Sequence, residues 1–375
     1  MTDIVILGAG YAGLAAATNL AGRTRKREDV RITLVNAAPR FTERLRLHST
    51  AAGHATADFD LAGLAATAGF TFIPGWITAV DAGARTVRVD DERTLHFDTL
   101  VWALGSTADT SDVPGAAEHA YTLDSFADAQ ALAARLNDLH TGTVLVCGTG
   151  LTGVETAAEI AERHPHLTVH LRGRDEPGAT LTPKARSYLQ GVLTRLDVRV
   201  ETGADIVKVL PDDADVIVWT AGTRVSPLAA AAGLAVDERG RIVTDPVLRS
   251  TSHPHVYAVG DAAAVRQRYG IMHGTCQGGM PTGVHAAQAI ARELDGREPR
   301  PFRFGYYHAP ISLGRRDAVV QFTHPDDSPR RGYLTGRAAV WYKETVSASP
   351  WPTYARMLKQ PGLASWWPRG GRFTR

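Results

Sequence analysis

Two segments of the chain repeat one hydrophobic pattern. Each begins with a short apolar run, at residues 4–7 and 144–147, passes through a glycine-containing turn and enters an alanine-rich stretch. A short apolar run bounded by glycine predicts a buried strand, and apolar residues spaced three and four apart predict a helix. A second strand follows at 30–35 in the first segment and at 167–171 in the second. Each segment therefore predicts a strand, helix, strand unit of a parallel sheet.

Other apolar runs predict strands that end in small or polar residues, where a chain can leave a sheet beside a ligand. These runs are residues 99–104 before Gly105-Ser106, residues 216–220 before Ala221-Gly222, and residues 255–259 before Gly260-Asp261. Residues 123–137 and 277–294 predict helices, the second of which contains Pro281. From residue 302 onward the pattern changes to shorter strands, at 311–313 and 319–322, and then to a tryptophan-rich tail.

This order of elements predicts an α/β protein with two Rossmann-like dinucleotide-binding domains and a small C-terminal region. We expect the strand at 255–259 to return to the first sheet, so that the second domain is inserted within the first. The expected boundaries are residues 1–110 and 239–300 for the first domain, 111–238 for the inserted domain and 301–375 for the C-terminal region.

Composition narrows the class of protein. The chain has 375 residues, of which 44% are hydrophobic and 21% charged, as in ordinary globular proteins. A net charge of +2 gives no electrostatic footprint for nucleic acid, and no apolar stretch approaches membrane-spanning length. Two cysteines far apart in the sequence suggest neither a disulfide framework nor a metal site, so we expect a cytoplasmic protein.

Each repeated segment carries a glycine fingerprint at its turn. The glycines are Gly8, Gly10 and Gly13 in the first copy and Gly148, Gly150 and Gly153 in the second. Only residues without a Cβ let a strand turn tightly, approach a pyrophosphate and enter a helix, whose N-terminal N–H groups then face the phosphates. A single fingerprint fits any tight turn, but two copies in the same strand and helix context predict two dinucleotide sites.

Three further segments carry a resemblance. They are Phe41-Thr42-Glu43-Arg44-Leu45-Arg46-Leu47-His48, Thr275-Cys276-Gln277 and Ile311-Ser312-Leu313-Gly314-Arg315-Arg316-Asp317. With the two fingerprints, they make the chain similar over nearly its whole length to two-dinucleotide-binding-domain flavoproteins, and within them to type II NADH dehydrogenases. Those single-subunit enzymes pass electrons from a nicotinamide through FAD to a quinone.

The resemblance implies which residues bind which cofactor. It assigns the first domain and its fingerprint to FAD and the inserted domain and its fingerprint to NADH or NADPH. It places Gly105 near the flavin and implies that Asp261 binds the ribityl chain of FAD. The cofactor-binding residues that it implies besides the fingerprints are Asn36, Arg44, Gly105, Glu155, Arg172, Gly222, Asp261 and Gln277.

Two positions depart from the pattern of that family. Asn36 stands where an acidic residue usually accepts hydrogen bonds from the adenosine ribose of FAD, and an amide can still make one or two such bonds. At the matching place in the second unit the chain reads His170-Leu171-Arg172-Gly173-Arg174, without the carboxylate that favours NADH. Arg172 and Arg174 can pair with the 2′-phosphate of NADPH, or belong to an ordinary solvated loop, so the sequence leaves both donors open.

Two residues are candidates for catalysis. Glu155, two residues past the last glycine of the second fingerprint, matches a glutamate that helps to place the nicotinamide, although a carboxylate there is also an ordinary helix N-terminal charge. Gln277 opens a helix whose positive end would stabilise a reduced flavin, and its amide can position a quinone carbonyl or serve only as a cap. His48 and His273 can supply a proton to a quinone or be structural histidines.

The cysteine inventory excludes disulfide reductases of the same architecture, which need a redox pair near the flavin. We expect Cys147 to be an inert buried thiol, and packing is the favoured role of Cys276.

The tail from residue 328 combines cationic and aromatic side chains against one acid, Glu344. They are Arg330, Arg331, Arg337, Lys343, Arg356, Lys359, Arg369, Arg372 and Arg375, with Trp341, Trp351, Trp366 and Trp367 among them. Such a segment suits peripheral contact with the inner face of the membrane, or packing on the protein's own surface. Pro350, Pro352, Pro361 and Pro368 argue against long helices in it.

The sequence thus predicts an FAD-dependent NAD(P)H oxidoreductase that reduces a quinone, with a homodimer as an expected assembly. Two alternatives stay open at this point. One is a soluble flavin oxidoreductase acting on another small-molecule acceptor or a biosynthetic intermediate. The other is a redox-sensing interaction protein like the relatives of apoptosis-inducing factor.

Overall fold

A five-stranded parallel sheet organises the first half of the molecule. The computed structural model describes residues 1–203, 205–363 and 366–374. The strand order is β15-β7-β1-β2-β3. These strands are β1 (Thr2–Leu7), β2 (Val30–Asn36), β3 (Thr71–Pro74), β7 (Thr99–Trp102) and β15 (Val256–Ala258). Because β15 pairs with β7, the chain returns to this sheet after a long excursion, as the sequence predicted.

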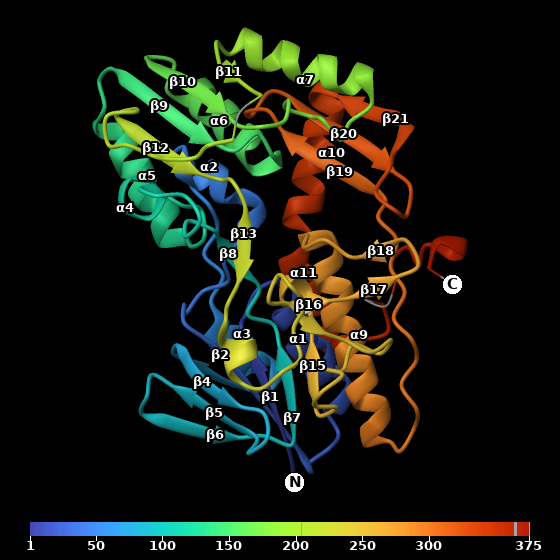
Figure 1. Cartoon of the computed structure of the whole chain (residues 1–375). Coiled ribbons are helices and arrows are strands. Elements are labelled where there is room, and N and C mark those ends of the chain that lie inside the picture. The colour runs from blue at the N-terminus through green and yellow to red at the C-terminus, as the bar shows by residue number, and fades with distance from the viewer. Residues whose placement is uncertain (204, 364–365, 375) are drawn as a thin grey trace.

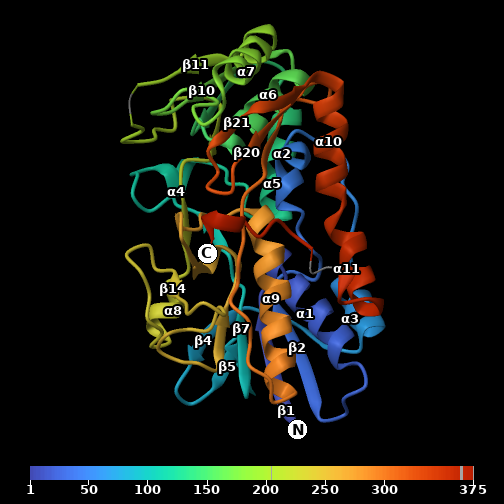
Figure 2. The same cartoon turned by 90° about the vertical axis from the view of Figure 1, so that its right-hand side faces the viewer.

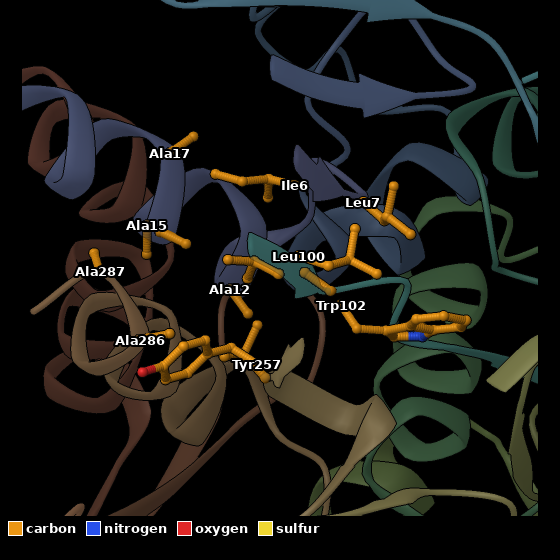
Figure 3. Packing of buried hydrophobic residues seen from close by; sticks show 14 of the residues in the cluster. Ile6, Leu7, Ala12, Ala15, Ala17, Leu100, Trp102, Tyr257, Ala286 and Ala287 are labelled. Carbon is orange, nitrogen blue, oxygen red and sulfur yellow. The ribbon is translucent and has the colours of Figure 1, made fainter. Parts of the chain in front are cut away.

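Helix α1 (Tyr11–Thr24) packs on this sheet, and α9 (Cys276–Leu294) packs closely on α1. A Cβ on Gly283 would lie 2.0 Å from the carbonyl oxygen of Ala12, so only glycine allows the observed approach. Figure 3 shows the resulting core, in which Ile6, Leu100 and Tyr257 of the strands meet small residues of α1 and α9. The alanine-rich sequence of α1 is therefore what lets a helix lie close to another helix and to the sheet.

A second parallel sheet forms the other half, in the order β11-β10-β9-β12. Its strands are β9 (Gly142–Cys147), β10 (Leu167–Arg172), β11 (Arg199–Glu201) and β12 (Val216–Trp219). Its helices are α5 (Phe126–Asp138), α6 (Leu151–Arg163) and α7 (Pro183–Arg195). The chain enters and leaves this half through an antiparallel pair, β8 (Ser106–Ala108) with β13 (Thr223–Val225), visible between the two halves in Figure 1. The predicted α/β fold with one dinucleotide-binding unit inserted in the other is confirmed.

The C-terminal region adds a three-stranded antiparallel sheet and two helices. These elements are β19 (His308–Ser312), β20 (Ala318–Thr323), β21 (Pro329–Thr335), α10 (Gly336–Ala348) and α11 (Pro350–Lys359). The prolines were expected to argue against long helices in this tail, and α10 and α11 have 13 and 10 residues. Pro350 and Pro352 both lie in the first turn of α11, where a missing N–H costs nothing, so they begin a helix rather than interrupt one.

Shorter elements complete the described chain. The helices are α2 (Leu47–Ala51), α3 (Leu61–Ala68), α4 (Ala116–His119) and α8 (Leu228–Ala231), with 3₁₀ turns at Arg44–Arg46, Gly260–Ala262 and Gly371–Phe373. The strands are β4 (Ile77–Asp81), β5 (Thr86–Val89), β6 (Arg93–His96), β14 (Ile242–Val243), β16 (Ala263–Ala264), β17 (Arg266–Gln267) and β18 (Gly270–Ile271).

Segments from the two ends of the chain reach both halves. Helix α2 lies against α5 and α6 of the inserted unit, and β19 lies against α6. Helix α11 packs on α1, where the carbonyl oxygen of Met357 would lie 2.4 Å from a Cβ on Gly22 (Figure 2). Among the described residues, none of the helices combines the length and apolarity needed to span a bilayer.

Candidate active site

The first glycine turn has the shape that a pyrophosphate needs. Gly8 has a φ of +93°, and a Cβ there would lie 2.5 Å from the carbonyl oxygen of Ala103. A Cβ on Gly13 would lie 1.8 Å from the carbonyl oxygen of Gly8. At Gly10, by contrast, a Cβ would meet no protein atom within 4 Å, and Gly10 caps α1 without a side-chain hydrogen bond. Two glycines are thus required by the protein's own packing, and the third leaves room beside the helix N-terminus for a phosphate.

The second turn repeats this geometry. Gly148 has a φ of +117°, and a Cβ on Gly153 would lie 1.8 Å from the carbonyl oxygen of Gly148. Gly150 again faces open space at the uncapped N-terminus of α6. The residues present therefore fit one dinucleotide pyrophosphate at each turn.

Asn36 supports the first turn directly. Its side-chain oxygen accepts a hydrogen bond from the Ala9 N–H at 2.8 Å, and its amide donates to the Ala38 carbonyl oxygen at 2.8 Å. An amide nitrogen carries two hydrogens, so one of them is left for a ribose hydroxyl. Its predicted contact with FAD adenosine stays a prediction, and the structure adds a role in holding the glycine turn.

Arg44, Ser106 and Asp261 meet beside the exit of β7. The Arg44 guanidinium donates to the Ser106 carbonyl oxygen at 2.5 Å and to Asp124 at 3.1 Å, and the Ser106 hydroxyl donates to Asp261 at 2.8 Å. Gly105, just before them, has a φ of +67° with no protein atom within 4 Å of its Cβ position. The cofactor residues that the sequence predicted from three separate segments are thus adjacent in space.

The two predicted catalytic residues both make hydrogen bonds to the backbone of strand β19. Gln277, in the first turn of α9, donates to the carbonyl oxygen of His308 at 2.9 Å, while its own side-chain oxygen is buried and has no partner among the described residues. Glu155 accepts a hydrogen bond from the N–H of Ser312 at 2.9 Å. Since β19 runs from His308 to Ser312, the two residues contact its opposite ends, roughly 13 Å apart at the rise of a strand.

Glu155 belongs to a group of four buried residues, which we call the Glu155 cluster: Glu155, Ser312, Lys343 and His48. The Lys343 ammonium lies 2.6 Å from the Glu155 carboxylate and 3.4 Å from the carbonyl oxygen of Pro310. Both charged side chains are about nine-tenths buried. A buried pair of this kind is tightly coupled because removal of either charge leaves the other without compensation. Glu155 is therefore more than an ordinary charge at a helix N-terminus.

The surroundings set the protonation of the Glu155 cluster. Burial alone would raise the pKa of Glu155, but Lys343, His48 and the hydrogen bonds outweigh it and hold the pKa below its usual value. The His48 side chain lies 3.8 Å from Glu155, and burial lowers the pKa of His48 to about 4. At neutral pH Glu155 is therefore a carboxylate and the imidazole of His48 is neutral.

Arg172 lies at the end of β10, next to the second glycine turn. It pairs in register with Glu201 of β11, whose carboxylate lies 2.8 Å from Arg172 and 2.8 Å from His170. The sequence pattern showed no acid at the end of β10, but the neighbouring strand supplies one. Arg174, the next cation along the chain, has a 70% exposed side chain, and its guanidinium lies 3.6 Å from the Asp205 carboxylate. Gly222 follows β12 with a φ of +91°.

The remaining candidate residues lie elsewhere or are inert. His273 is half exposed, stacks on Tyr306 and pairs with Asp327 at 3.4 Å, so it does not join the Glu155 cluster. Both cysteines are free thiols, and burial raises the pKa of each to about 12. Neither thiol is a nucleophile at neutral pH.

Lys343 was not predicted as a site residue. The sequence reads it as one cation of a basic tail, but Ala339, Lys343 and Ser347 recur every four residues and form the buried face of α10. A lysine on the apolar stripe of a helix is a signal for a buried ion pair, and this spacing was the available clue.

Comparison with known proteins finds a matching family and similar sequences over most of the chain. A model of the family described as pyridine nucleotide-disulphide oxidoreductase matches residues 2–291. The NADH dehydrogenase-like protein Rv1812c of Mycobacterium tuberculosis is 29% identical over 353 residues, covering 85% of this chain and 87% of that protein. A type II NADH:quinone oxidoreductase of Staphylococcus aureus is 28% identical over 389 aligned positions, covering 92% of this chain and 93% of that protein.

Among solved structures, the sulfide:quinone oxidoreductase of Aquifex aeolicus is similar with a TM-score of 0.79. The match covers 97% of this chain and 93% of that chain at 16% sequence identity, so this likeness shows the fold alone.

Proposed function

The chain belongs to the pyridine nucleotide-disulphide oxidoreductase family, and from this premise we propose that it passes electrons from NAD(P)H through FAD to a quinone. It is an oxidoreductase that uses FAD and NAD(P)H. The quinone is the proposed step. It is supported by the type II NADH:quinone oxidoreductase among its relatives, which is similar over nearly the full length of both chains.

The observation that carries the proposal is the arrangement on β19. At one end of the strand a buried amide oxygen of Gln277 has no partner in the part of the chain that the structure describes, and at the other end the Glu155 cluster holds a buried carboxylate and ammonium. A quinone carbonyl needs hydrogen-bond donors and a proton source as it is reduced to a hydroxyl. The amide nitrogen of Gln277 keeps a second hydrogen that it can donate to a quinone carbonyl, and its side-chain oxygen can accept from the hydroxyl that forms. The Lys343 ammonium of the buried ion pair is a further donor beside the same strand.

FAD, when bound, supplies the ring that takes a hydride from NAD(P)H and delivers two electrons. Gly8, Gly10 and Gly13 would hold its pyrophosphate, and Asp261 its ribityl chain. The protein's own residues then position the donor and balance the charges in the site. Glu155 orients the nicotinamide end of the donor, Lys343 balances the charge of Glu155, and the N-terminus of α9 stabilises negative charge beside Gln277.

Glu201 bears on the choice of donor, and we propose that NADH is preferred. The carboxylate of Glu201 already neutralises Arg172, a cation at the end of β10, where the adenosine ribose is expected. A 2′-phosphate would have to displace this carboxylate and would be repelled by it, whereas ribose hydroxyls can donate to it.

The visible absorbance of the purified protein, titrated anaerobically with NADH and then with NADPH, tests these proposals. Flavin bands that bleach with NADH and recover on addition of a soluble quinone support the reaction. A protein that bleaches but does not recover with any quinone would point to another acceptor, the soluble oxidoreductase alternative. Slow bleaching without turnover would favour the redox-sensing alternative.

The donor preference has its own test in Glu201→Gln. The variant removes the negative charge and frees Arg172, so kcat/KM for NADPH relative to NADH is expected to rise by about tenfold, or roughly 1.4 kcal/mol. Glu238→Gln, which replaces an exposed glutamate in the loop after β13 and α8, is the control. An unchanged ratio in the Glu201 variant would remove the basis for the donor assignment.

We further propose that the C-terminal region touches the membrane surface. Trp341 and Trp366 are 71% and 86% exposed, among basic residues of the tail. Part of the same region is folded on the protein, since α11 packs on α1, and residues 364–365 and 375 lie outside the described part. In a flotation experiment, anionic vesicles are expected to bind the native protein and float with it, and Trp341→Ala is expected to reduce the bound fraction.

The cytoplasmic location and the homodimer stay predictions. Analytical sedimentation would test the homodimer.

A further inference from the structure

Glu159 is a buried carboxylate that the proposed reaction does not yet use. It lies one turn along α6 from Glu155, and its side chain is fully buried. One carboxylate oxygen accepts a hydrogen bond from the Ser49 hydroxyl at 3.2 Å and lies 3.3 Å from the imidazole of His54. The other oxygen is buried with no hydrogen-bond partner among the described residues. A fully ionised carboxylate would be costly in this position.

The groups that face Glu159 come from every element packed around it. Glu155 and Glu162 lie on the same helix, Ser49 lies on α2 and His54 follows that helix. Arg315, from the turn between β19 and β20, is 4.0 Å away and is itself paired with Glu344 at 3.0 Å. Burial, only partly offset by Arg315 and Ser49, raises the pKa of Glu159 to about 7. The carboxyl therefore exchanges its proton near neutrality.

His54 lies between Glu159 and water, and His48 belongs to the Glu155 cluster on the inner side. The His54 side chain is 32% exposed, so its ring reaches both the solvent and the buried carboxylate. On the inner side, His48 precedes Ser49 on α2 and lies 3.8 Å from Glu155. Two titratable pairs thus lie on successive turns of α6: His54 with Glu159 on the side that reaches solvent, and His48 with Glu155 on the inner side.

The reaction itself requires such a route. Reduction of a quinone to a quinol takes two electrons and two protons, whereas NAD(P)H supplies two electrons and one hydrogen as hydride. One proton per turnover must therefore come from water. We propose that Glu159 carries this proton, receiving it through His54 and passing it toward His48 and Glu155. The inference rests on the proposed quinone reduction and names the path that it uses.

The first experiment compares two acceptors in Glu159→Gln and His54→Ala. Ferricyanide takes one electron at a time and no proton, so its reduction releases the hydrogen of the hydride as a proton and draws none from water. Quinone turnover in Glu159→Gln is expected to fall by about tenfold or more, while ferricyanide turnover with the same donor stays at the native rate. Imidazole in the buffer is expected to restore quinone turnover in His54→Ala. The controls are Glu118→Gln and His140→Gln, which replace exposed residues outside the site.

The second experiment measures the proton on Glu159 without turnover. Infrared difference spectra of the native protein between pH 6 and pH 8 are expected to show the carbonyl stretch of a protonated carboxyl that disappears on ionisation. The band should be absent in Glu159→Gln and present in Glu118→Gln.

The outcomes separate this inference from the proposed function. Native quinone turnover with an unaffected Glu159→Gln variant, or an equal loss with both acceptors, overturns the relay and leaves the function standing. A native protein that reduces no quinone overturns the function, and the relay with it, whatever the infrared band shows. A missing band in a protein that does reduce quinones excludes Glu159 as the proton carrier.

Discussion

At the scale of single residues, the site depends on two buried charges that neutralise each other. Lys343→Ala leaves the Glu155 carboxylate buried and unpaired, so the free energy of unfolding is expected to fall by about 3 kcal/mol. Urea denaturation at pH 7 measures it. Lys359→Ala, an exposed lysine of α11, is the control.

A double variant separates charge from packing in this pair. Lys343→Met with Glu155→Gln removes both charges while it keeps the side-chain volumes, and it is expected to recover most of the stability lost with Lys343→Ala. If the double variant were as unstable as the single one, shape rather than charge would be responsible.

Glu159 makes stability depend on pH. Its pKa is raised to about 7 from a usual value near 4.5, so between these pH values the folded state binds the proton more tightly than the unfolded state. Stability is therefore lost as pH rises through this range, by roughly 3 kcal/mol at pH 8. Glu159→Gln has no such loss, so its stability relative to the native protein is expected to rise from pH 5 to pH 8. Equal pH profiles of unfolding would contradict the raised pKa.

At the scale of elements, the glycine turns separate folding from binding. Gly150 has φ and ψ that alanine also adopts, and its Cβ position is free of protein atoms. Gly150→Ala is therefore expected to change stability by less than about 0.5 kcal/mol. The added methyl occupies the phosphate space, so NADH affinity in an anaerobic titration is expected to fall by about tenfold or more.

A matched glycine on another helix provides the control. Gly191 of α7 is exposed with no atom within 4 Å of its Cβ position, so Gly191→Ala is expected to add about 0.5–1 kcal/mol of stability without affecting binding. Tight NADH binding in Gly150→Ala would place the pyrophosphate elsewhere.

Local patterns in the sequence were sufficient for most of these elements. The strands β1, β9 and β10 and the helix α9 follow from apolar runs and glycine positions, because such elements are defined by neighbours in the chain. The partner of Glu155 could not be predicted in this way. Lys343 lies 188 residues away, and only the packing of α10 on β19 and β20 brings the two together.

Glu201 illustrates the same limit for donor recognition. The end of β10 carries no acid of its own, and the sequence therefore allowed a phosphate to bind Arg172. Register between β10 and β11 sets Glu201 opposite Arg172, and this pairing is the basis of the proposed preference for NADH. A short exposed strand such as β11 has too weak a pattern for its register to be predicted.

At the scale of the whole molecule, the C-terminal helix α11 is attached to the first helix of the chain. Tyr354 is fully buried and donates to the carbonyl oxygen of Tyr11 at 3.2 Å, and Asn19 donates to that of Pro361 at 3.0 Å. Gly22→Ala is expected to separate the helices, because its Cβ would lie 2.4 Å from the Met357 carbonyl oxygen. The cost of overpacking is about 1–3 kcal/mol.

Limited proteolysis measures this attachment. Trypsin is expected to cut the Gly22→Ala variant faster than the native protein after Arg356 and Lys359, both on α11. The Gly191→Ala control should be cut at the native rate. No acceleration in Gly22→Ala would mean that α11 does not depend on this contact.

The C-terminal region contributes side chains to both hydrophobic cores, and this affects how the chain folds during synthesis on the ribosome. The core of the first half includes Tyr354 and Met357, and that of the inserted half includes Ile311 and Val319. A nascent chain of about 300 residues would already contain both glycine turns, yet neither hydrophobic core would be closed. Exposed apolar surface of this kind promotes aggregation during folding. The last fifth of the chain therefore completes both halves, and a prematurely terminated product is expected to need chaperones rather than fold as a smaller enzyme.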